Sequence, residues 1–198
     1  MTDILDKVRK AVAKSGSGSS DFDLNPDIQR PKNRKLRPAG VLVPLIQSGD
    51  ELQLILTKRS SALKHHPGQI AFPGGKVDPG DEDEVAAALR EAHEEIGLPP
   101  EQVDLIGQMP PHETVTGFTV TPVVGFVPKP FDIVAELGEV EEVFTVPFKH
   151  VSNLANYVHQ GRMWQGNMRM YETVPYGPYY IWGATARMLR ALAERLPQ

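Results

Sequence analysis

The chain has 198 residues, of which 40% are hydrophobic and 23% are charged, and its net charge at pH 7 is -4. No apolar run approaches the roughly 20 residues that span a bilayer, and the N-terminus lacks the apolar core of a signal peptide, so we expect a cytoplasmic protein without a membrane partner. The acidic net charge argues against a nucleic-acid partner, although a local cationic pocket can still bind an anionic small molecule. The absence of cysteine excludes disulfides, thiolate nucleophiles and cysteine-bearing zinc sites.

The first 36 residues are predicted to form a short helix followed by a flexible linker. Residues 3–14 carry apolar side chains at helical spacing, namely Ile4, Leu5, Val8, Val12 and Ala13. The stretch SGSGSS that follows has the composition of a flexible tether. A single folded domain is expected over residues 37–198. The helix could serve as a lid, as a contact in a homodimer or as a disordered tail.

The rest of the chain alternates strand-like runs with two longer helical patterns. Residues 40–60 contain two β-rich runs around an SGDE turn, which predicts a hairpin or two neighbouring strands. Further strand candidates are residues 69–73, 102–109, 119–127 and 142–148. Near the C-terminus one apolar stripe predicts a closing helix, formed by Ile181, Thr185, Met188, Leu189, Leu192 and Leu196. Strands with two main helices predict an α/β fold of the layered α+β kind with a mixed sheet.

The first of the two main helices is acidic and is predicted over residues 82–96. Asp81 is expected to be its N-cap, with Glu84 three residues later completing a capping box, and Gly97 is expected to end it. One apolar stripe would face the sheet, formed by Val85, Ala88, Leu89, Ala92 and Ile96.

Glu91, Glu94 and Glu95 fall within one narrow arc on another face of this helix, at about 100° per residue. Like charges so placed repel each other unless a cation lies among them, and Arg90 alone, paired with Glu94 at i+4, cannot neutralise the cluster. A divalent metal can. A solvated helix face is the alternative, because charge runs usually face water. The glycine pair of the preceding FPGGK favours the metal site, since glycine lets backbone atoms approach a ligand closely.

This segment resembles the Nudix box, in which a glycine and a glutamate precede REUxEExGU with U an aliphatic residue. The matching positions are Gly75, Arg90, Glu91, Glu94, Glu95, Gly97 and Leu98. The chain differs in three ways. Asp81 occupies the place of the first glutamate, one extra residue separates it from Arg90, and Ala92 stands at an aliphatic position.

The longer spacing and the aspartate are similar to those of the coenzyme A pyrophosphatase subfamily of Nudix hydrolases. That subfamily also has an upstream motif, LLTxRSxxxRxxxGxxxFPGG, which ILTKRSSALKHHPGQIAFPGG at residues 55–75 resembles. The one clear difference is Lys64 in place of arginine, which keeps the charge but loses the bidentate fork. The segments at residues 116–125 and 181–186 also resemble the subfamily, so that the resemblance covers roughly residues 36–196.

The resemblance implies a Nudix-type α/β/α sandwich with Mg²⁺ or Mn²⁺ as cofactor. It implies that Glu94 and Glu95 bind the metal, that Glu91 is a ligand or the base that orients water, and that the Gly75 carbonyl is a further ligand. Arg90 would position the carboxylates, with a simple salt bridge as the alternative role. Glu139 is expected to be an additional metal ligand, favoured over Glu141 and Glu142. The substrate would be bound by Arg59, Lys64 and Gly74.

The implied function is hydrolysis of the diphosphate of coenzyme A to 3′,5′-ADP and 4′-phosphopantetheine. Such hydrolysis requires cations that screen the phosphate oxygens and an oriented base, and clustered carboxylates provide both. One alternative is another nucleoside diphosphate derivative such as ADP-ribose or a dinucleotide as substrate. The other is a non-catalytic Nudix-like module that binds a nucleotide without turnover, although such modules commonly lose the carboxylates that this chain retains.

Overall fold

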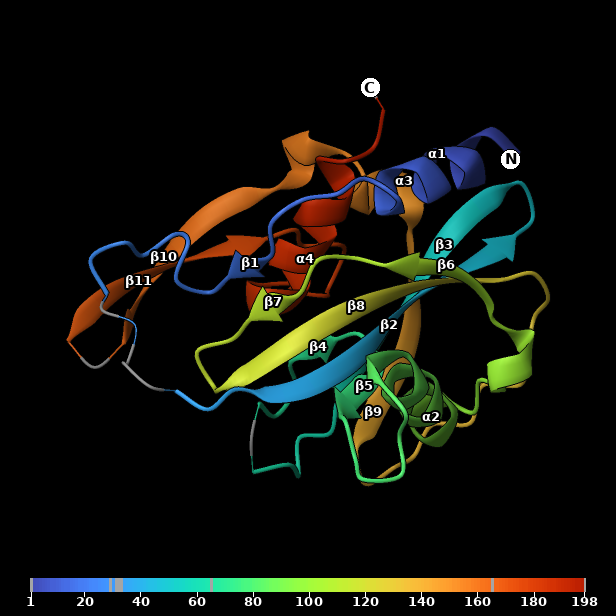
Figure 1. The fold of residues 1–198 in the computed structure, drawn as a ribbon, viewed down its shortest axis with the longest axis horizontal. Coiled ribbons are helices and arrows are strands. Elements are labelled where there is room, and N and C mark those ends of the chain that lie inside the picture. Colours follow the sequence, from blue (N-terminus) through green and yellow to red (C-terminus); the bar gives the residue numbers. More distant parts are fainter. Residues whose placement is uncertain (1, 29, 31–33, 65, 165, 198) are drawn as a thin grey trace.

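A computed structural model describes residues 2–28, 30, 34–64, 66–164 and 166–197. It has helices on both faces of a mixed sheet (Figure 1). The helices are α1 (Thr2–Val12), α2 (Glu84–Ile96), α3 (Phe148–Val151) and α4 (Gly183–Ala193). The strands are β1 (Ser19–Ser20), β2 (Arg37–Ser48), β3 (Glu51–Arg59), β4 (Ile70–Ala71), β5 (Gly74–Lys76), β6 (Asp104–Gln108), β7 (His112–Glu113), β8 (Phe118–Val127), β9 (Val140–Pro147), β10 (Val158–Trp164) and β11 (Asn167–Thr173). Of the described helices, none is long and apolar enough to cross a membrane.

Strand β2 is the centre of the sheet. It pairs with β8 in parallel and with β3 and β5 in antiparallel orientation, while β9 pairs with β3 and β6 with β8. The predicted hairpin of residues 40–60 is confirmed as β2 and β3, with Ser48 opposite Glu51 across the turn. The four other predicted strands are confirmed as β4, β6, β8 and β9. The prediction of a layered fold with a mixed sheet is therefore confirmed.

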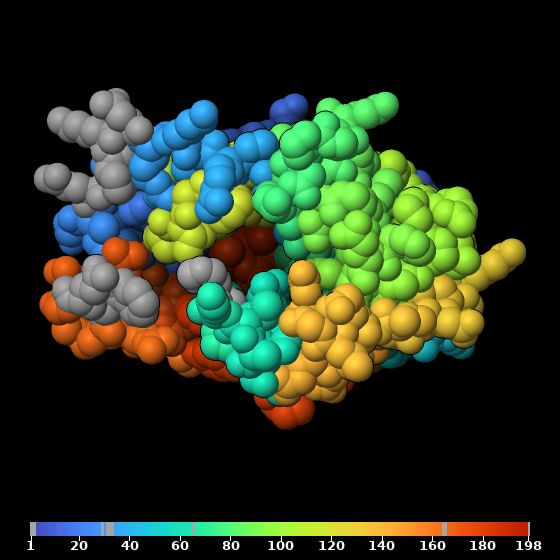
Figure 2. All heavy atoms as spheres, turned by 90° about the horizontal axis from the view of Figure 1, so that it is seen from below, coloured from blue at the N-terminus to red at the C-terminus, as the bar shows by residue number. Residues whose placement is uncertain are grey.

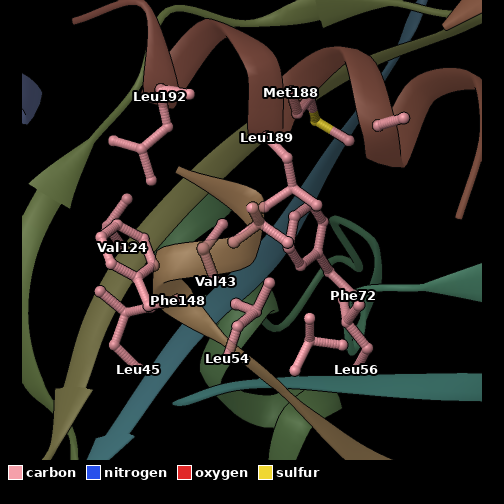
Figure 3. Packing of buried hydrophobic residues seen from close by; sticks show 14 of the residues in the cluster. Val43, Leu45, Leu54, Leu56, Phe72, Val124, Phe148, Met188, Leu189 and Leu192 are labelled. Carbon is pink, nitrogen blue, oxygen red and sulfur yellow. The ribbon is translucent and has the colours of Figure 1, made fainter. Parts of the chain in front are cut away.

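One face of the sheet packs against α4. Figure 3 shows Met188, Leu189 and Leu192 of α4 directed at side chains of the sheet such as Val43 and Leu54. Leu189 is 2% exposed and Leu192 is 3% exposed. The predicted closing helix and its apolar stripe are confirmed, with Leu196 only partly buried beyond the helix end.

The opposite face of the sheet packs against α2. The predicted stripe is confirmed, because Ala88, Ala92 and Ile96 are buried and Val85 and Leu89 pack against the same cluster. Strand β2 presents Gly40 to this helix, and a Cβ at Gly40 would overlap the carbonyl oxygen of Glu84. Small residues on both elements therefore bring the backbone of α2 close to the sheet.

The N-terminal residues pack on the same core as the strands that follow them. The predicted helix is confirmed as α1, with Val8 and Ala11 fully buried. In the stretch predicted to be a flexible tether, Ser19 and Ser20 form β1 and pair in parallel with His112 and Glu113 of β7. The domain boundary at residue 37 stays a prediction. Neither β5 nor the β10–β11 hairpin was predicted from the sequence.

Candidate active site

Helix α2 begins two residues later than predicted. Asp83, not Asp81, is its N-cap, and the Asp83 carboxylate accepts hydrogen bonds from the N–H groups of Val85 and Ala86, each at 2.9 Å. Three acidic residues in a row precede the helix, and because both Asp81 and Asp83 are good N-caps, the sequence pattern could not single one out. The predicted end is confirmed. Gly97 has φ of 74°, a left-handed conformation that favours glycine, and its N–H bonds to the last turn of the helix.

Asp81 instead forms a two-point ion pair with Arg90. The Arg90 Nε and Nη2 atoms donate to the two Asp81 oxygens at 2.9 and 3.0 Å, and the Asp81 side chain is only 5% exposed. Arg90 also contacts Glu91 at 3.1 Å and donates to Glu94 at 3.0 Å, which is the predicted i, i+4 pair. Arg90 therefore connects the turn before α2 to two of the predicted site carboxylates.

The glycine pair of β5 lies directly against two glutamates of α2. The Gly74 N–H donates to Glu95 Oε2 at 3.1 Å, and a Cβ at Gly75 would overlap the Glu91 carboxylate. Gly74 has φ of 151°, and a Cβ there would overlap Gly40 and Val41 of β2. Only glycine therefore allows β5 to pass between β2 and the carboxylates.

Burial raises the pKa of both of these carboxyl groups. Glu95 is 4% exposed, and burial raises its pKa to about 8, against the opposing effects of the Gly74 N–H and the nearby positive charge of Arg59. Burial also raises the pKa of Glu91, while Arg90 acts to lower it. The charge of Glu139 contributes to raising the pKa of Glu91 and of Glu95. The three acidic groups therefore influence each other's protonation, and a cation bound near them would favour their charged forms.

The loop that connects β3 to β4 borders these carboxylates. Backbone hydrogen bonds join Arg59 to Gly68 and Gln69 at the base of this loop. The Ser60 N–H donates to the Glu139 carbonyl at 2.8 Å. Figure 2 shows a hollow in the surface bordered by this teal loop, the light-blue start of β2 and the yellow-green start of β8, with red atoms of the C-terminal segment at its floor.

The structure brings some of the predicted site residues together and leaves others apart. Gly74, Gly75, Glu91, Glu95, Glu139 and Arg59 lie around one another. The Glu94 side chain is 57% exposed and is bound to Arg90, and Lys64 is exposed in the β3–β4 loop. Glu141 pairs with Lys58 at 2.6 Å, and Glu142 accepts a hydrogen bond from the Tyr179 hydroxyl at 2.6 Å.

The donor chemistry fits a hard divalent cation. Within the part of the chain that the structure describes, no group of three acidic or histidine side chains converges as a ready-made metal site. However, Glu91, Glu95 and Glu139 supply anionic oxygens near the partly buried Gly75, and Mg²⁺ and Mn²⁺ prefer such oxygen ligands. Burial is the main cause of the raised pKa values of Glu91 and Glu95, and a bound cation would offset both that effect and the smaller repulsion between the carboxylates.

Comparison with known families finds one that matches most of the chain. The family described as NUDIX domain matches residues 36–169. An uncharacterized Nudix hydrolase NudL from Enterobacter sp. (strain 638) is 44% identical over 160 residues, which are 81% of this chain and 83% of that protein. The protein of the same description from Cronobacter sakazakii is 44% identical over 173 residues, which are 87% and 89% of the two chains.

Solved structures of similar fold include two proteins of the Nudix family. The M. smegmatis Nudix hydrolase RenU is 27% identical, with a TM-score of 0.50 over 59% of this chain and 73% of that one. A MutT/nudix family protein from Enterococcus faecalis has a TM-score of 0.53 over 86% of this chain and 65% of that one, at 15% identity. The second comparison bears on the fold alone, and it agrees with a mixed sheet between helices.

Proposed function

The chain belongs to the Nudix family, and on that premise we propose that it is a coenzyme A diphosphatase that uses Mg²⁺ or Mn²⁺. It is a Nudix hydrolase, and the reaction class is the hydrolysis of a pyrophosphate bond. The products proposed are 3′,5′-ADP and 4′-phosphopantetheine.

The observation that carries the choice of substrate is the position of residues 55–75. This is the segment that resembles the upstream motif of coenzyme A pyrophosphatases, and it runs through the end of β3, the β3–β4 loop and β5. Its Arg59 influences the charge of Glu95, and its Gly74 donates to the same carboxylate. The motif that distinguishes substrates thus adjoins the carboxylates that the chemistry needs.

The proposed roles follow from burial and charge. Glu95, Glu91 and Glu139 would hold the metal together with the Gly75 carbonyl, and Glu94 would join them on release from Arg90. When bound, the metal would offset the negative charge of the phosphate oxygens, which otherwise repels the attacking water. If Glu91 does not bind the metal, it would instead be the base that orients the attacking water. Arg59 and Lys64 would bind the substrate's phosphates as cations.

The test is a substrate comparison with purified protein. Coenzyme A, ADP-ribose and a dinucleotide are incubated in parallel with millimolar Mg²⁺ or Mn²⁺, the products are separated by chromatography, and Glu95→Gln serves as the inactive control. Release of 3′,5′-ADP and 4′-phosphopantetheine that is lost in the variant supports the proposal. Cleavage of ADP-ribose alone would keep the mechanism and reject coenzyme A. No metal-dependent turnover of any of the three would favour a binding module.

A further inference from the structure

We infer that Lys35 and Arg37 bind a second phosphate group of the substrate, a phosphomonoester on the ribose, and so select ribose-phosphorylated nucleoside diphosphates over unphosphorylated ones. This inference rests on the proposed function and names the part of the substrate that the start of β2 recognises. Arg37 is the first residue of β2 and pairs with Phe118 at the start of β8, and Lys35 lies two residues before it. The starts of β2 and β8 border the hollow in Figure 2.

The direction of Arg37 follows from the alternation of β2. Ala39, Val41 and Val43 pack on the face of the sheet that α4 covers, and Arg37 continues the same face two residues further out. Its neighbour across the parallel pair is Phe118, which packs against the same cluster. The face of the sheet under α4 is therefore apolar along β2 and cationic at the start of that strand.

The charges of these two residues are available to a ligand. Residues 30–37 contain five of the chain's 21 lysines and arginines, although the chain as a whole is acidic. Arg34 is used inside the protein, because it donates to the carbonyls of Thr114 and Val115 at 2.9 and 2.8 Å. Lys35 and Arg37 are exposed, and no described carboxylate pairs with either of them.

Arg37 is also held in a suitable orientation. Its guanidinium carbon lies 4.0 Å from the centre of the Phe118 ring. A guanidinium that stacks on a ring keeps the N–H groups of its edge free, and these form the fork that grips a phosphate with two hydrogen bonds. The same stacked pair presents a flat surface beside which a base can lie.

Arg37 is within one nucleotide of the proposed diphosphate site. Gly40 of β2 lies directly opposite Gly75 of β5, which adjoins Glu91. Arg37 is three residues before Gly40 in the same strand, which corresponds to about 10 Å at the rise of a β-strand. Gly40 faces α2 and Arg37 continues the opposite face, so a nucleotide whose 5′ phosphate lies at Gly75 would bring its ribose phosphate to Arg37 by passing over the end of β2.

The test measures binding, so that it does not depend on turnover. The affinities of 3′,5′-ADP and 5′-AMP, which differ only in the ribose phosphate, are compared by calorimetry in the presence of Mg²⁺. We expect the wild-type protein to prefer 3′,5′-ADP by about tenfold or more, as for a charge-assisted pair of hydrogen bonds. In the double variant Lys35→Gln/Arg37→Gln the ratio should fall to about one. Equal affinities in the wild type, or an unchanged ratio in the double variant, would overturn the inference.

Two further variants sharpen the result. Lys129→Gln removes one exposed cation beyond the opposite end of β8 and should leave the affinity ratio as it is. Arg37→Lys keeps the charge but not the fork, and should retain only part of the preference. Unfolding midpoints of all variants verify that they fold.

Failure of the inference and failure of the proposed function give different results. If coenzyme A is hydrolysed no faster than its 3′-dephospho form, the function stands and the inference is overturned. If coenzyme A is not hydrolysed but 3′,5′-ADP binds more tightly than 5′-AMP through Lys35 and Arg37, the substrate is rejected and the inference stands.

Discussion

The two faces of the sheet differ in what they bury. Under α4 lie large apolar side chains from many elements, including Leu54, Phe72 and Leu189. Under α2 lies a smaller cluster in which two alanines of the helix face the sheet, and at its margin the helix buries the carboxyl group of Glu95. Burial of apolar side chains under α4 stabilises the folded protein. Burial of the Glu95 carboxyl group under α2 destabilises it.

This difference explains the small residues on the α2 face. Gly40 and Ala88 let the helix approach the sheet, and Gly74 and Gly75 let β5 pass close to the carboxylates. Close approach excludes water from Glu95 and raises its pKa. The α4 face carries the stability that allows the α2 face to keep a destabilising but functional arrangement. The predictions below test this division.

The largest effect is expected from Glu95→Gln. Loss of a metal ligand removes about 4 kcal/mol of transition-state stabilisation, which corresponds to about a thousandfold in kcat/KM. Glutamine resembles the protonated carboxyl group in shape, so the unfolding midpoint of the metal-free protein near neutral pH should not fall. Steady-state kinetics and thermal unfolding measure the two effects. A clear loss of stability with retained activity would assign Glu95 to the structural face.

Leu189→Ala should lower stability and leave activity little changed, the reverse of the effect expected for Glu95→Gln. Deleting a fully buried leucine side chain in the α4 cluster is expected to cost about 3 kcal/mol of unfolding free energy, with kcat little changed below the transition. Leu89→Ala on α2 is the matched variant, and because Leu89 is only partly buried it should cost about 1 kcal/mol. Urea unfolding gives both values. Equal losses would contradict the division between the two faces.

The pH dependence of the metal-free protein should report the buried carboxyl group. The pKa of Glu95 in the folded protein, about 8, exceeds 4.5, so the folded state binds the proton more tightly than the unfolded state. Stability should therefore fall as pH rises between about 4.5 and about 8, by up to about 1.4 kcal/mol per pH unit from this group. Denaturant unfolding in EDTA at a series of pH values measures the slope.

Glu95→Gln should flatten that slope, which identifies the group responsible. Added Mg²⁺ or Mn²⁺ should raise the unfolding midpoint, and more so at higher pH, because a carboxylate must lose its proton to bind a metal. An identical slope in the variant would assign the titration to another group.

Asp81→Asn tests the ion pair that links the turn to α2. The amide loses one of the two charge-assisted bonds to Arg90, which in turn contacts Glu91 and Glu94. We expect kcat/KM to fall by about tenfold, as for other groups that orient metal ligands. Asp83→Asn is the control, because asparagine still caps a helix and Asp83 does not contact Arg90. Equal kinetic losses in the two variants would mean that Arg90 has no positioning role.

The sequence predicted most of the elements but not how the turn before α2 is used. The helical stripes of α2 and α4 and the five predicted strand regions are strong periodic signals, because each has one face on the core. The run of acids from Asp81 to Glu84 has no such signal, and its division between Arg90 and the helix cap depends on tertiary contacts. The β10–β11 hairpin was missed because residues 158–164 do not alternate between apolar and polar, and because Met163 and Met168 are exposed and do not mark a face on the core.

The smallest effect is expected from Glu141→Gln, and it decides between Glu141 of β9 and Glu139 just before that strand. Glu141 is exposed and paired with Lys58, and its pKa is lowered by that hydrogen bond, so its loss should leave both kcat/KM and the unfolding midpoint almost unchanged. Glu139→Gln should lower kcat/KM, because the charge of Glu139 contributes to raising the pKa values of Glu91 and Glu95. Because both variants remove one negative charge from the same segment, a reversed outcome would move the proposed ligand from Glu139 to Glu141. In that case the carboxylates of α2 would draw their partner from the strand itself and not from the turn before it.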